Sequence, residues 1–206
     1  MPDAGKIRLN PEAALDCLFV AHRLQMQSAG FAGPELHLFA YLACLLWLYR
    51  QRAATDWGYS FVGTELGAPF SLEINESVNE LLARSYFVRV GERLHMTELA
   101  QQPLHDFARL VVNQERMECL QAACASTAAF SVGMISTALA EEPELRRAHA
   151  VPASRHLLEE SAQTQLYVHF NALRQALRER GNDLRLPAIV WLSALYRSSE
   201  SAVVEE

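Results

Sequence analysis

The chain has 206 residues, of which half are apolar and a fifth charged, and its formal net charge is 18 − 24 = −6. This length is typical of one domain or two small ones, and the composition is that of a globular protein with an apolar core. The negative sum excludes a protein whose whole surface is a basic clamp for nucleic acid, although a local basic patch stays open. No residue pattern names a chemical reaction.

The first residues contain no apolar stretch of the kind that a secretory signal needs, so we expect a cytoplasmic protein. The longest apolar run, Leu36–Tyr49, is shorter than the roughly 20 residues that cross a bilayer, and it predicts a buried core helix and no membrane contact. The cysteines lie in apolar, helical contexts and are expected to be reduced and packed as small hydrophobic side chains: Cys17, Cys44, Cys119 and Cys124.

Residues 1–30 are predicted to form an N-terminal helical arm. Asn10 is a favourable cap and Pro11 a favourable first helical residue, and apolar residues then recur at helical spacing as far as Met26. Gly30 is expected to end the segment. The apolar face of this helix must pack either on the rest of the chain or on a second copy of the chain, so self-association is left open.

Residues 31–112 have the pattern of a compact domain. A helix starting at Gly33 is apolar nearly all round and should lie at the centre of the fold. A long loop over 55–70 follows, and Ser71 can cap a third helix. The period then changes from helical to alternating, and a short glycine turn within 87–96 predicts a β-hairpin.

Residues 113–206 are predicted to be helical, with an acidic tail over 200–206. A long helix is expected to start near Pro103 and to run through a stretch of small side chains as far as Ala140. A second helix is expected over 153–180, ended by Gly181 and Asn182, and a last one from Pro187. The predicted fold class is therefore mainly α, with one β-hairpin and a C-terminal helical bundle.

The order of elements in residues 31–112 resembles a winged-helix domain. The third helix would be Ser71–Arg84 and the wing Phe87–Met96. The segment Met96–Leu99 is similar to the leucine-threonine-x-x-glycine exit of many bacterial winged-helix regulators, although Ala100 replaces the usual glycine. The resemblance implies a module that binds DNA or protein, since the fold serves both.

The charges of the third helix favour a protein partner over DNA. Its predicted exposed face carries three carboxylates that would repel phosphates: Glu73, Glu76 and Glu80. Residues 31–112 sum to 6 − 9 = −3. The candidate contacts to a nucleic-acid backbone are Arg84 at the helix end and Arg89 and Arg93 on the wing. A DNA-binding regulator that dimerises through its helical half is the alternative, and it requires one basic stripe built from Arg50, Arg52, Arg84, Arg89 and Arg93.

A narrower resemblance involves the segments Trp57–Phe61, Gly67–Phe70 and Glu73–Arg84. These look like the middle components of three-part bacterial antiphage systems built on ABC-type ATPases, and they are similar to accessory winged-helix subunits of chromosome-maintenance ATPases. Those accessory subunits usually carry two winged-helix units in tandem, whereas one wing is evident here. The resemblance implies a non-catalytic adaptor that joins a coiled-coil ATPase to an effector.

Four aromatic residues in the long loop have two interpretations. They are either a small packed cluster beneath the loop or exposed anchors for a partner, because Trp and Tyr dominate interface hot spots. They are Trp57, Tyr59, Phe61 and Phe70.

We find no catalytic motif, no metal-ligand spacing and no phosphate-binding glycine loop, so no cofactor is expected. An enzyme would require a closed pocket in which His and Glu side chains converge.

The function expected from the sequence is that of a non-enzymatic adaptor bound to protein subunits of a larger complex. The N-terminal helix, the loop over 55–70 and the C-terminal helices would hold it there, and the acidic third helix would face a basic or polar protein surface. Contact with DNA would be weak or indirect.

Overall fold

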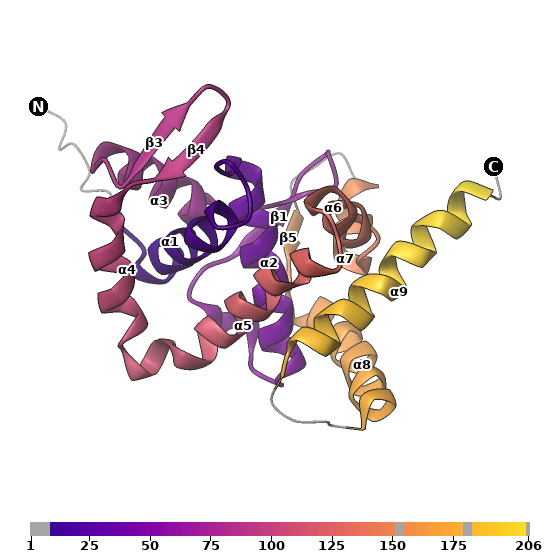
Figure 1. Cartoon of the computed structure of the whole chain (residues 1–206). Helices are drawn as coiled ribbons and strands as arrows, with labels where there is room; N and C mark the ends of the chain where they lie inside the picture. The colour runs from indigo at the N-terminus through magenta and orange to yellow at the C-terminus, as the bar shows by residue number, and fades with distance from the viewer. Residues whose placement is uncertain (1–8, 151–154, 179–182, 205–206) are drawn as a thin grey trace, which may run out of the picture.

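The structure is a computed structural model that describes residues 9–150, 155–178 and 183–204. The described residues are mainly helical, which confirms the predicted fold class (Figure 1). The helices are α1 (Pro11–Gln25), α2 (Gly33–Tyr49), α3 (Leu72–Ala83), α4 (Gln101–Ala108), α5 (Gln114–Ala125), α6 (Val132–Ala140), α7 (Pro143–His149), α8 (Glu160–Leu177) and α9 (Arg185–Val204). The strands are β1 (Phe61–Gly63), β2 (Pro69–Phe70), β3 (Phe87–Val90), β4 (Arg93–Met96) and β5 (Arg155–Leu157).

Helix α2 is the centre of the molecule, as its apolar sequence predicts. It is buried on nearly every side from Leu36 to Tyr49, and it contacts α1, α3, α5 and α8 (Figure 1). A helix that is apolar all round gains most when other elements cover it completely. Among the described helices, no single one is both long and apolar enough to cross a membrane.

Helix α1 packs on the rest of the chain, which is one of the two positions left open for its apolar face. Asn10 caps it as predicted, since its Oδ1 accepts a hydrogen bond from the backbone N–H of Ala13 at 2.9 Å. The helix packs on α2, α3 and α5, and its residues belong to the same apolar core as those of α5 and α9. Buried residues on both sides of residues 30 and 112 belong to this one core, and the domain boundaries expected there stay a prediction.

Helix α3 and the β3–β4 hairpin follow the local sequence signals. Ser71 Oγ accepts the backbone N–H of Ile74 at 3.4 Å, so the predicted cap is confirmed. The hairpin pairs Phe87 with Met96 and Val90 with Arg93, and Gly91 has a φ of 60° in its turn. This left-handed conformation is one that glycine adopts without strain.

The segment between α2 and α3 was predicted to be a loop, and this prediction is wrong in part. It holds a short 3₁₀ helix, η1 (Ala54–Trp57), and strands β1 and β2. Strand β1 is the middle of an antiparallel sheet in the order β2-β1-β5. Strand β5 occupies residues that were assigned to a helix starting at 153, and residues 153 and 154 lie outside the described part of the chain. The pairing joins segments far apart in sequence, which local periodicity does not reveal.

The long helix predicted from Pro103 to Ala140 is also wrong. The chain forms α4, α5 and α6 there, joined by short 3₁₀ turns, and it bends by 113° between residues 111–128 and 132–140. Ser131 begins α6, because its Oγ accepts the backbone N–H of Met134 at 3.2 Å. Serine competes with the backbone for hydrogen bonds and so favours a new helix start over a continuous helix.

The C-terminal helices largely match expectation. Leu166 and Phe170 of α8 and Trp191 and Leu192 of α9 are buried, and α9 packs on α5, α6 and α8. Gly181 and Asn182, the predicted helix stop, lie outside the described residues. The acidic tail, expected to fray, continues α9 in helical form as far as Val204.

The cysteines are free and buried, as the sequence predicts. Burial raises the pKa of the Cys119 thiol and of the Cys124 thiol to about 12, so both stay protonated at neutral pH. They pack as small hydrophobic side chains.

Candidate protein-interaction surface

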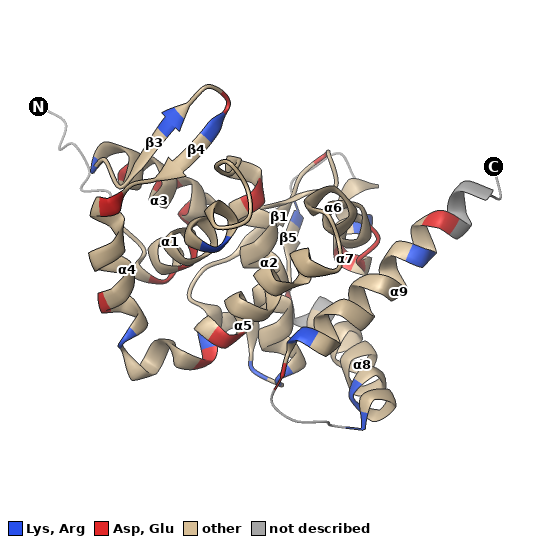
Figure 2. Ribbon diagram, in the orientation of Figure 1, with Lys and Arg blue, Asp and Glu red and all other residues tan. Residues whose placement is uncertain are grey.

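The outer face of α3 is acidic. Glu76 is exposed and Glu73 and Glu80 are half-buried, whereas Ile74 and Leu81 face the core. Helical spacing places the carboxylates on a different side of α3 from Ile74 and Leu81, and Figure 2 shows acidic residues along α3. The predicted acidic face is therefore present as a surface, and a phosphate backbone lying along it would be repelled.

The five arginines of the DNA hypothesis do not form one stripe. Arg50 and Arg52 follow α2 and pair with Glu118 and Glu115 of α5, with N–O distances of 2.5 Å and 2.7 Å. On the α3 side, three further arginines differ in their pairing. Arg84 Nε lies 2.6 Å from Glu80, Arg93 lies 3.7 Å from Glu35 and donates to the carbonyl of Gly30, and Arg89 has no carboxylate partner among the described residues.

Three of the four loop aromatics are core residues and not exposed anchors. Trp57, Tyr59 and Phe61 are 0%, 9% and 1% exposed. Their rings contact one another and the aromatic residues of α2. The interpretation of these three as a packed cluster therefore holds, because a ring that is covered in the folded chain cannot reach a partner. Phe70 is half-buried and stacks on His37, with ring centroids 4.9 Å apart.

A buried ion pair holds this cluster, and the sequence analysis did not identify it. Arg116 of α5 makes two parallel hydrogen bonds to Asp16 of α1, at 2.6 Å and 2.7 Å, and donates a third to the carbonyl of Trp57 at 2.7 Å. Tyr59 donates to the same carboxylate. The guanidinium lies over the Trp57 ring, 3.8 Å from its centroid. An acid within a run of apolar residues in α1 is the one signal that points to this pair.

The Asp16–Arg116 ion pair connects elements of the core. Burial raises the pKa of Asp16, and the Arg116 guanidinium acts in the opposite direction. The carboxylate accepts hydrogen bonds from two residues and is 0% exposed, so neither an external base nor a substrate reaches it. A bidentate arginine fork fixes α1, α5 and η1 relative to one another.

A second buried acid, Glu142, joins α7 to α2. Tyr41 donates to Glu142 Oε2 at 3.0 Å, and the same oxygen accepts the backbone N–H of Leu145. Burial raises the pKa of this carboxyl group. Two glutamates followed by Pro143 are typical of a break between helices, but this pattern does not reveal that the Glu142 side chain is buried.

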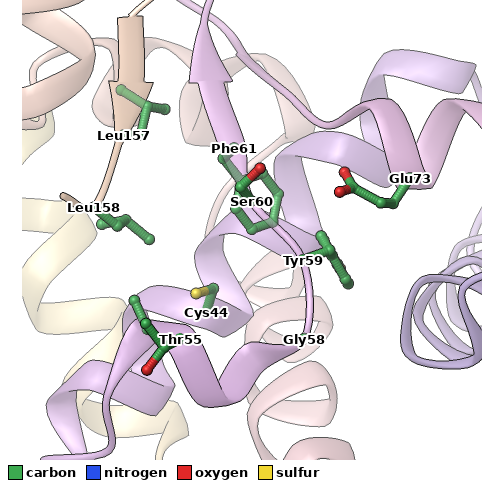
Figure 3. A pocket seen from close by; sticks show the side chains of 10 residues that line it. Cys44, Thr55, Gly58, Tyr59, Ser60, Phe61, Glu73, Leu157 and Leu158 are labelled. Carbon is green, nitrogen blue, oxygen red and sulfur yellow. The ribbon is translucent and has the colours of Figure 1, made fainter.

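A pocket of about 410 Å³ opens beside the acidic face of α3. Figure 3 shows Glu73 on one side of it, Leu157 and Leu158 on the other, and Ser60 between them. Tyr59, Phe61 and Glu73 are the predicted interaction residues that line it, whereas Trp57 and Phe70 do not. Among the described residues that line this pocket, Glu73 is the one with an ionisable carboxylate and none is a histidine.

His37 holds the start of α3 and is 8% exposed. Its Nδ1 accepts the backbone N–H of Ser71 at 3.1 Å, and burial lowers its pKa to about 4. The unfolded chain takes up this proton at a pH near 6.5 and the folded chain only near 4, so stability is present above pH 6.5 and is lost as the pH falls between these values.

We expect the wild type to lose about 2 kcal/mol more stability between pH 7 and pH 5 than the His37→Gln variant does. Glutamine keeps a neutral acceptor for the Ser71 N–H but takes up no proton in this range. Urea unfolding at the two pH values measures the difference between the two proteins, which removes the contribution of other titrating groups. Equal losses would show that His37 is as free to titrate in the folded chain as in the unfolded one.

Among the described residues, no three or more His, Cys, Asp or Glu side chains are grouped so that they could hold a metal ion. No protein-family model, curated protein or solved structure matches the chain.

Proposed function

We propose that the chain is a non-enzymatic, cytoplasmic adaptor that binds a basic surface of a partner protein through the acidic face of α3. The observation that carries this proposal is the unbalanced charge of α3. Glu73 and Glu76 have no arginine or lysine partner in the described structure, and Arg84 neutralises only Glu80. An uncompensated acidic patch steers and orients a basic partner.

The pocket beside α3 supports the same proposal. It offers a carboxylate from Glu73 and apolar walls from Leu157 and Leu158. A lysine or arginine side chain has matching parts, an aliphatic stem and a charged end. The partner side chain that fits this pocket is therefore a cationic one, inserted with its stem against the leucines.

The order α1, α2, α3 and the β3–β4 hairpin favours a winged-helix module, in keeping with the resemblance stated above. On that basis the partner would be a subunit of a coiled-coil ABC-type ATPase assembly in antiphage defence. The alternative, a DNA-binding regulator, has less support, because the arginines that it requires are largely paired with carboxylates.

The proposal is tested by affinity capture of the tagged chain from its native host, with nuclease treatment and mass spectrometry. We expect a stoichiometric partner that survives nuclease and is lost at least tenfold with Glu73→Lys/Glu76→Lys. The matched control is Glu98→Lys/Asp106→Lys, which changes the net charge equally (−6 + 4 = −2) at exposed sites outside α3 and keeps the partner. Recovery of nuclease-sensitive DNA alone would refute the adaptor and favour the regulator.

A further inference from the structure

The two edges of the β3–β4 hairpin differ in how their backbone groups are satisfied. On the outer edge of β4, Leu94 exchanges both of its backbone hydrogen bonds with Phe31, at 2.7 Å and 2.9 Å. Next along that edge, the side-chain amide of Gln25 accepts from the N–H of Met96 and donates to its carbonyl. The fold therefore covers this edge completely.

The outer edge of β3 is not covered in this way. Arg89 pairs with Leu94 across the hairpin. Because Leu94 directs its N–H and C=O toward Phe31, the two residues form a non-hydrogen-bonded pair, and the N–H and C=O of Arg89 must point away from β4. Within the described part of the chain, no hydrogen bond reaches these two groups. They are the kind of groups to which an added strand binds.

The side chains along this edge indicate what such a strand contains. Val88 and Val90 lie on one face of the hairpin and are 40% and 61% exposed. Arg89 projects from the other face, is exposed, and has no carboxylate partner among the described residues. An added strand that alternates apolar and acidic residues would cover the valines and neutralise the arginine.

A second copy of the chain fits this edge poorly. Antiparallel pairing of two β3 edges about a two-fold axis at Arg89 would place the two arginines beside each other, and like charges in such pairs destabilise a sheet. Charge complementarity instead favours a partner strand that places an acidic residue beside Arg89.

We propose that the outer edge of β3 binds an extended segment of a partner protein, with apolar and acidic residues in alternation, as an additional antiparallel strand. The hydrogen bonds to Arg89 supply affinity, and the side chains supply selectivity. This site is separate from the acidic face of α3 and attracts the opposite charge, so each proposal can fail without the other.

The test uses the full chain and labelled six-residue peptides whose binding is followed by fluorescence anisotropy. We expect a peptide of alternating Val and Asp to bind about tenfold more tightly than one of alternating Val and Lys. The Arg89→Glu variant should reverse this order. Methylation of the peptide nitrogens that face the edge should weaken binding about tenfold, because it removes donors without changing the side chains.

Two variants at one position separate the backbone contribution from the charge. Arg89→Thr keeps the outward N–H, so it should lose the preference for acid but still bind. Arg89→Pro also removes the N–H, which β4 does not use, and should abolish binding while the hairpin stays folded. The Glu73→Lys/Glu76→Lys variant should bind the acidic peptide as the wild type does.

Hydrogen exchange gives a readout at the site itself. The amide of Arg89 should exchange at least tenfold more slowly when the acidic peptide is bound. The proposal is overturned if neither peptide binds, if both bind equally, or if the acidic peptide binds without protecting this amide. A dimer in sedimentation that Arg89→Pro dissociates would assign the edge to a second copy and would equally overturn it.

Discussion

Replacing Arg116 by methionine is expected to lower the free energy of unfolding by about 3–5 kcal/mol. The substitution removes a guanidinium that is 5% exposed and leaves the Asp16 carboxylate buried without its cation. It also removes the donor to the Trp57 carbonyl and the cation over the Trp57 ring. Urea unfolding at neutral pH measures the loss.

The matched control for this pair is Arg52→Met. Arg52 pairs with Glu115, but their side chains are 50% and 45% exposed, and such pairs contribute about 0–1 kcal/mol. The double variant Asp16→Leu/Arg116→Met should have a free energy of unfolding at least as high as that of the less stable of the two single variants, Asp16→Leu and Arg116→Met. The reason is that the double variant buries no isolated charge. Additive losses in the double variant would contradict the coupling that the geometry implies.

Replacing Trp57 by alanine is expected to cost about 3–5 kcal/mol of stability and to leave partner binding per folded molecule unchanged. The ring is fully buried, contacts Trp47 and Tyr59, and lies beneath the Arg116 guanidinium. Its removal leaves a cavity among elements that cannot collapse freely. Thermal unfolding and capture from the native host measure the two effects separately.

Leu66 in the turn between β1 and β2 provides the control. It is 89% exposed, so Leu66→Ala should change stability by no more than about 0.5 kcal/mol. If Trp57→Ala were as stable as the wild type and yet lost the partner, the ring would be an interface anchor after all. The distinction matters because interface aromatics and core aromatics are identical in sequence.

The two proposals together would give the chain opposite preferences at two places. The α3 face and its pocket are proposed to bind cationic side chains, whereas the β3 edge is proposed to bind an acidic strand. Both lie on the α3–hairpin side of the molecule (Figures 1 and 2). A partner that carried both features would be bound in one orientation, since reversing it would bring like charges together.

Much of the local structure follows from the sequence because its causes are local. Asn10 and Ser71 cap helices through hydrogen bonds that span three residues, and Gly91 sits at the one hairpin position that needs a positive φ. Helix α2 carries apolar side chains on nearly all sides, and this determines its central position, since no other position would bury every side. The charge of the α3 face also follows from residue spacing alone.

What the sequence by itself did not determine depends on contacts between distant segments. The Asp16–Arg116 pair spans 100 residues, and the β1–β5 pairing joins the segment before α3 to the segment before α8. The open edge of β3 is defined by Phe31 and Gln25, which cover the other edge. Periodicity reports which side of an element is apolar, but only the tertiary structure decides what covers it. That is why Trp57 lies in the core and Arg89 remains at an uncovered edge.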